Sequence, residues 1–136
     1  MKHNNDITIL TQAFYGNRTI TTVTEDTFDY LMLGYLDKKY LDTERMKLDR
    51  TMIRVPGTEN LVLFYNKYQE EERLENLREF IQDLRGNTYR MNPTAVIPEL
   101  GIVLYSRCFA CRVNDAGDPV SLEDGDVEKV LPYLAS

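Results

Sequence analysis

Apolar and polar residues alternate along the first part of the chain in a way that favours β-strands. Residues 7–15 and 19–23 are rich in Ile, Thr, Val and aromatic side chains, which fit the pleated surface of a sheet. Gly16 and Asn17 stand between these segments and tolerate the positive φ angles of a tight turn. The pattern therefore predicts a β-hairpin near the start of the chain.

The next pattern has the period of a helix. Thr24 is followed by two acidic residues, which suits a helix N-terminus because free N–H groups and the helix dipole favour oxygen and negative charge. One apolar stripe at helical spacing then follows, made of Phe28, Leu31, Met32, Tyr35 and Leu36. Residues 41–49 fit a strand and a helical turn equally well, and both assignments stay open there.

A second hairpin and a second helix are predicted in the middle of the chain. Residues 51–55 and 61–65 are β-prone, and Pro56-Gly57 between them favours a type II turn. The continuous apolar run at 61–65 indicates a strand that is buried on both faces. A helix is expected over residues 67–85, with its charged residues on a solvated outer face. Its buried stripe would consist of Leu74, Leu77, Ile81 and Leu84.

The last third of the chain is expected to return to the sheet. Four elements are predicted there: an interrupted strand at 88–96 that contains Pro93, a long central strand at 102–113, a short edge strand at 119–122 and a short helix from Val127 to Leu134. The Gly-containing loop at 114–118 would join the second and third of these as a hairpin.

The order of these elements is ββα, ββα, β, ββα. It predicts one α+β domain over residues 1–136, with a mostly antiparallel sheet built from β-hairpins, each followed by a helix, and the helices packed on one face. The 136 residues, of which 43% are hydrophobic, are enough for a core of their own.

Charge and cysteine content exclude some classes of function. The net charge of −6 argues against direct nucleic-acid binding and against binding to an anionic membrane, because phosphate contacts need Lys and Arg. No apolar run is long enough to span a bilayer, and the polar first residues do not form a signal peptide. With only two cysteines, we expect a complete small cytoplasmic protein.

The most conspicuous chemical motif is the pair Cys108 and Cys111. Both fall within the long strand predicted at 102–113, where residues three apart point to opposite faces, so we expect reduced structural thiols rather than a redox or zinc site. His3 is the only histidine and lies too near the terminus to be an anchored general base. The sequence contains no nucleotide-binding or calcium-loop motif. We therefore expect no cofactor, metal or catalytic residue.

Two arginines lie in the same apolar strand, where a buried guanidinium needs an anionic partner. Arg107 and Arg112 either form ion pairs at the sheet rim, or hold a ligand phosphate or a partner carboxylate, with Tyr105 as a stacking group. The odd spacing of the two arginines would direct them to opposite faces. A common phosphate clamp would therefore need a bulge in the strand or a second subunit.

These features favour a non-enzymatic binding module that acts on a protein partner as an adaptor or inhibitor. Small acidic proteins of this kind are often antagonists encoded by phages or other mobile elements. The alternative is a protein that sequesters an anionic ligand such as a nucleotide through Arg107, Arg112 and Tyr105. In this alternative a homo-oligomer would complete the binding site. A third hypothesis is an enzyme of unrecognised type.

Overall fold

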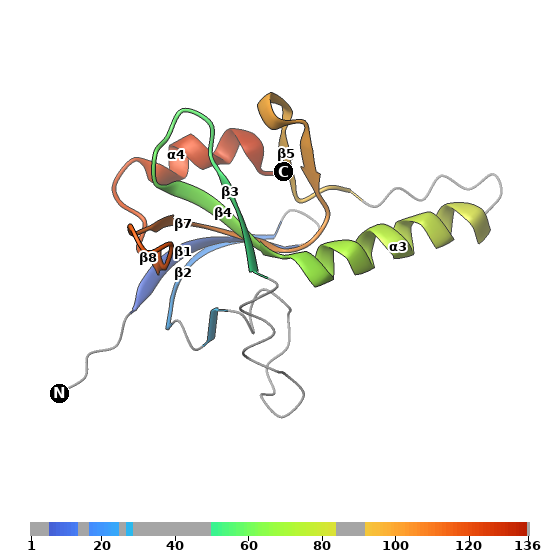
Figure 1. Ribbon diagram of the computed structural model, residues 1–136, viewed down its shortest axis with the longest axis horizontal. Helices are drawn as coiled ribbons and strands as arrows, with labels where there is room; N and C mark the ends of the chain where they lie inside the picture. The colour runs from blue at the N-terminus through green and yellow to red at the C-terminus, as the bar shows by residue number, and fades with distance from the viewer. Residues whose placement is uncertain (1–5, 14–16, 25–26, 29–49, 84–91, 136) are drawn as a thin grey trace.

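The computed structural model describes residues 6–13, 17–24, 27–28, 50–83 and 92–135, and from residue 76 to the end of the long helix it describes only the backbone. The protein is of the α+β class, with a mostly antiparallel sheet (Figure 1). The sheet strands are β1 (Ile7–Gln12), β2 (Arg18–Val23), β3 (Arg50–Arg54), β4 (Leu61–Asn66), β7 (Cys108–Val113) and β8 (Pro119–Val120). Their order is β2-β1-β7-β4-β3, and β8 also pairs with β7.

The remaining elements lie around this sheet. A separate two-stranded ribbon is formed by β5 (Ala95–Ile97) and β6 (Ile102–Leu104), joined by the short 3-10 helix η3 (Pro98–Leu100). The described part of the chain includes the helices α3 (Lys67–Asp83) and α4 (Asp126–Val130), and the 3-10 turn η4 (Leu131–Tyr133) continues α4. Of the helices within the described ranges, none has the length and apolar content that crossing a membrane requires.

The turn chemistry explains the hairpins. In the β3–β4 turn, the N–H of Thr58 donates to the carbonyl of Val55 at 3.1 Å, and Gly57 has a φ of +80°. Proline followed by a residue of positive φ defines a type II turn, as predicted. The first hairpin is also confirmed, because β1 and β2 pair in register from Gln12 opposite Arg18 to Ile7 opposite Val23.

The core has two halves, one on each face of the sheet. The first cluster contains Leu10, Ile53, Val55, Leu61, Leu63, Ala95, Ile97, Leu104, Cys108, Ala110, Val130 and Leu134. The second contains Ile7, Ile9, Val23, Phe28, Val62, Phe64, Phe109 and Cys111. Alternate residues of β7 belong to the two clusters, because successive side chains of a strand point to opposite faces of the sheet. β7 lies between β1 and β4, which confirms its expected central position.

The covering layers differ between the two faces. Residues of α4, η4 and the β5–β6 ribbon pack on the first cluster, whereas Phe28 packs on the second. The N–H of Phe28 donates to the carbonyl of Thr24 at 3.1 Å, a hydrogen bond that closes one helical turn. The expected repetition of hairpin and helix, with every helix on one face, is therefore not confirmed.

The prediction of one strand over residues 102–113 is wrong. The chain leaves the β5–β6 ribbon after Leu104 and enters the main sheet at Cys108. Between them, the backbone N–H groups of Tyr105 and Ser106 donate to Glu70 Oε1, each at 2.9 Å. The Glu70 carboxylate of α3 thus accepts the two hydrogen bonds that a neighbouring strand would otherwise accept, and the strand is interrupted at these two residues.

The predicted burial of the long helix is also partly wrong. α3 runs away from the sheet rather than along it (Figure 1), and Leu74 of the expected stripe is exposed. Glu70, in the first turn of α3, is buried. The first turn is anchored by the side-chain oxygen of Asn66, which accepts the N–H of Gln69 at 3.0 Å.

Several predictions lie outside the described residues. They include the end of the strand predicted at 7–15, the turn residue Gly16, the two acidic residues after Thr24, the part of the first helical stripe after Phe28, the open assignment at 41–49, the start of the strand predicted at 88–96, His3, and the side chains of Leu77, Ile81 and Leu84.

Candidate functional site

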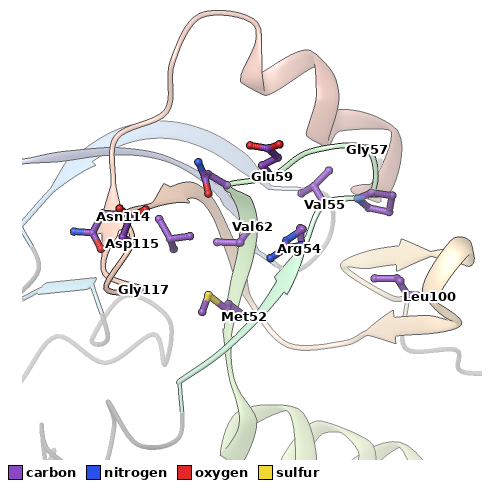
Figure 2. Close-up of a pocket in the computed structure, with 13 residues that line it drawn as sticks. Met52, Arg54, Val55, Gly57, Glu59, Val62, Leu100, Asn114, Asp115 and Gly117 are labelled. Carbon is purple, nitrogen blue, oxygen red and sulfur yellow. The ribbon is translucent and has the colours of Figure 1, made fainter.

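A broad hollow lies at the end of the sheet where the β3–β4 turn and the β7–β8 loop meet. Its volume is about 730 Å³. Figure 2 shows Met52 and Val62 in its centre, Asn114 and Asp115 on one side and Leu100 on the far side. The hollow is lined by Met52, Arg54, Val55, Pro56, Gly57, Glu59, Asn60, Val62, Leu100, Val113, Asn114, Asp115 and Gly117.

The floor of this hollow is apolar because the second core cluster continues into it. Met52, Val62 and Val113 stand on three neighbouring strands, and Val62 and Val113 pack with that cluster. Met52 is 47% exposed and Leu100, across the hollow, is 50% exposed. Large apolar side chains that remain this exposed around a concavity are typical of binding surfaces.

The rim of the hollow is charged. In the part of the chain that the structure describes, the side chains of Arg54, Glu59 and Asp115 make no hydrogen bond or ion pair. Asn114 stabilises the β7–β8 loop, because its Oδ1 accepts hydrogen bonds from the N–H groups of Ala116 and Asp118, each at 3.0 Å. The loop is thereby held in shape while the charged groups stay available to a ligand.

The predicted site residue Arg112 lies behind the β3–β4 turn, in a smaller hollow of about 250 Å³. Its Nε and Nη2 donate to the two carboxylate oxygens of Asp126 at 2.7 and 2.9 Å, and Glu123 is 3.6 Å away. These hydrogen bonds from Arg112 lower the pKa of Asp126 below its ordinary value. The arrangement corresponds to the ion pair at the sheet rim, the first of the two alternatives weighed for this arginine.

The other two predicted residues lie at the opposite end of β7. The N–H of Tyr105 is bound by Glu70, and the N–H of Arg107 donates to Gln69 Oε1 at 2.9 Å. Arg107 directly precedes β7, and Arg112 stands near its other end. One copy of the chain therefore brings Tyr105 and Arg107 near each other but does not bring Arg112 to them.

The cysteines lie on opposite faces of the sheet, as predicted. Cys108 belongs to the first core cluster and Cys111 to the second, and both are free thiols. Burial raises the pKa of each thiol to about 12. Since the thiolate is the nucleophile, neither is suited to redox or nucleophilic chemistry at neutral pH.

The sequence contains weak signals for the residues of the large hollow. Period-two alternation puts Met52 on the face opposite the buried Ile53, and Leu100 is an apolar residue in a turn. Neither signal shows that β3 and the β5–β6 ribbon approach the same concavity. Among the described residues, no group of His, Cys, Asp and Glu is arranged to hold a metal ion.

The chain matches no protein-family model, no curated protein and no solved structure.

Proposed function

We propose that this chain is a non-enzymatic binding module that acts on a protein partner as an adaptor or inhibitor, and that the large hollow is its docking surface. The observation that carries the proposal is the exposure of Met52 and Leu100 around an apolar floor. Apolar anchors in a central depression with a polar rim are the usual anatomy of protein interfaces.

The charges of the rim suggest the chemistry of the partner. Glu59 and Asp115 are available on the rim and the whole chain carries a net charge of −6, against one available arginine, Arg54. A partner segment with an apolar side chain for the floor and basic side chains for the rim would be complementary. Such charges accelerate association and select the partner more than they add affinity.

The alternative of an anionic small-molecule ligand has less support. The fork of Arg112 is engaged by Asp126, and a clamp that included Arg107 would need a second copy of the chain. The volume of the large hollow would suit a small molecule, but its available charges are mostly negative.

The test compares two exposed apolar residues. We expect Met52→Lys to abolish capture of the partner, because it places a charge on the floor and repels basic side chains. Leu74→Lys on α3 is the matched control, since Leu74 is also exposed but lies outside the hollow. Captured candidates are identified by mass spectrometry, and each is then titrated as a purified protein against both variants by calorimetry.

A partner that binds the wild type and the Leu74 variant equally well, and binds the Met52 variant at least tenfold more weakly (about 1.4 kcal/mol), would support the proposal. Equal affinity for both variants would place the interface elsewhere. The finding that no purified protein binds, together with a thermal shift caused by a nucleotide, would favour the small-molecule alternative.

A further inference from the structure

Within the described residues, the outer edge of β2 has little of the protection that proteins give to an edge strand, and its one charged residue is Arg18 at the first position. β2 is six residues long and pairs with β1 along its full length, and in the described part of the chain no strand lies on its other side. It contains no Pro, Lys, Asp or Glu. Arg18, Thr19, Ile20 and Thr22 are exposed, with Ile20 at 56%, whereas Val23 at the end of the strand is buried. Long edges of this kind readily pair with another strand.

The register determines which backbone groups face outward. The N–H of Ala13 donates to the carbonyl of Asn17 at 2.8 Å, so this pair is hydrogen-bonded just beyond Gln12 and Arg18. Hydrogen-bonded pairs alternate along an antiparallel ladder. Thr19, Thr21 and Val23 therefore bond to β1, whereas Arg18, Ile20 and Thr22 direct their N–H and C=O groups to the open edge.

We propose that β2 pairs antiparallel with β2 of a second copy of this chain, with the two-fold axis at Ile20. In this arrangement Ile20 lies opposite Ile20 of the second copy, and Arg18 lies opposite Thr22 of the second copy. All outward groups of the three residues find partners. The exposed isoleucines pack against each other on one face, and a two-fold axis of this kind closes the assembly as a dimer.

Charge favours a second copy on this edge. The chain carries −6, so copies repel each other over most of their surface, but β2 has no acidic residue. The two Arg18 residues would be four positions apart along the strand, or about 14 Å, which exceeds the screening length of about 8 Å at physiological salt. Each guanidinium is also held in its own subunit, by Gln12 Oε1 at 2.9 Å and the carbonyl of Ala135 at 2.8 Å.

The opposite edge of the sheet, β3, has a charge pattern that disfavours pairing with a second copy. Antiparallel pairing of β3 with a second β3 about Met52 would place Arg50 opposite Arg54 of the second copy. Like charges directly opposite each other destabilise a strand pair. The charge pattern therefore selects β2 over β3 for self-association.

Sedimentation velocity over a concentration series tests the proposal. We expect a dimer at the upper concentrations, and a monomer at every concentration for Ile20→Lys, which places two ammonium groups on the axis. Circular dichroism should show the variant folded, because Ile20 is exposed. Leu74→Lys is the matched control and should remain dimeric, because Leu74 is also exposed but lies outside β2 and outside the proposed docking surface. A monomeric wild type, or a dimer that persists in Ile20→Lys, would overturn the proposal.

A cysteine pair tests the register. Hydrogen-bonded antiparallel partners have Cα atoms about 5.5 Å apart, which is within the range of a disulfide. Ile20→Cys should thus oxidise to a covalent dimer, whereas Thr22→Cys should not, because its two copies would be about 14 Å apart. The buried native thiols should not compete. Equal cross-linking of both variants, or of Thr22→Cys alone, would refute pairing about Ile20.

Discussion

The Arg112 guanidinium and the Asp126 carboxylate meet through two parallel hydrogen bonds of 2.7 and 2.9 Å. Arg112 stands on the central strand β7, and Asp126, which is fully buried, is the first residue of α4. Asp126 Oδ2 also accepts the N–H of Glu123 at 2.7 Å. The pair therefore fixes both the position of α4 on the sheet and the path of the chain that enters it.

This pair predicts how stability depends on pH. Because the pKa of Asp126 is lower in the folded than in the unfolded protein, its ionised form favours folding. The contribution is complete above the unfolded pKa of about 4 and is lost as the pH falls through the lower folded value. We expect the free energy of unfolding, measured in urea, to decrease below about pH 5 partly for this reason.

Asp126→Asn is the informative variant for the pH dependence. It should be less stable than the wild type at pH 7, because Arg112 then faces a neutral amide instead of a carboxylate. The two proteins should converge in stability at low pH, where the carboxyl group of Asp126 is protonated. Asp124→Asn, an exposed neighbour, should retain the wild-type pH profile. If the free energy of unfolding of Asp126→Asn decreased below pH 5 as steeply as that of the wild type, the pair would not be responsible for the pH dependence.

Glu70 is predicted to stabilise the loop at 105–107. Glu70→Ala leaves two backbone N–H groups without their acceptor and should reduce the free energy of unfolding by about 2–3 kcal/mol. Glu70→Gln keeps an acceptor oxygen and should cost about half as much, or about 1 kcal/mol. Glu71→Ala, exposed on the same turn, should stay within about 0.5 kcal/mol. Urea unfolding of the three variants decides this, and equal losses would contradict it.

Local chemistry explains which parts of the fold could be predicted. The β3–β4 turn depends on two adjacent residues, Pro56 and Gly57, and the pairing of β1 with β2 depends on neighbouring strands. The break after Leu104 depends on Glu70, which is more than thirty residues away in the chain. A contact of that kind has no local pattern, and the apolar residues on both sides of 105–107 suggested one continuous strand.

The candidate site was less predictable for the same reason. Arg112 could be identified as an arginine in need of a partner, but nothing in the sequence selected Asp126 from the 22 acidic residues. Met52 stands on β3 and Leu100 ends η3, the turn between β5 and β6, and their shared hollow is a result of tertiary packing. The alternation of β7 did predict the opposite placement of the cysteines, because it depends only on strand geometry.

The cysteines are predicted to be unreactive in the folded protein. Both are buried and have pKa values of about 12, so almost no thiolate exists at pH 8. A chromogenic disulfide reagent should label neither thiol in native buffer and both after addition of denaturant. Rapid labelling of the native protein would contradict the burial of the two thiols.

Phe28 packs on the second face of the sheet, where it belongs to the second core cluster. Its ring contacts those of Phe64 and Phe109 edge to face, each with a centroid distance of 5.3 Å. The Arg50 guanidinium lies over the same ring, with Cζ 5.0 Å from its centroid. Phe28→Ala removes a fully buried ring and should cost about 3–5 kcal/mol in urea unfolding.

Phe28→Leu separates the two contributions of this residue. Leucine keeps most of the apolar volume but loses the edge-to-face contacts and the contact with Arg50, so we expect a loss of about 1–2 kcal/mol. Val103→Ala on the exposed side of β6 is the control and should stay within about 0.5 kcal/mol. If Phe28→Ala were as mild as the control, residues 27–28 would not form part of the core. If Phe28→Leu were as severe as Phe28→Ala, the aromatic contacts rather than burial would hold this segment to the sheet.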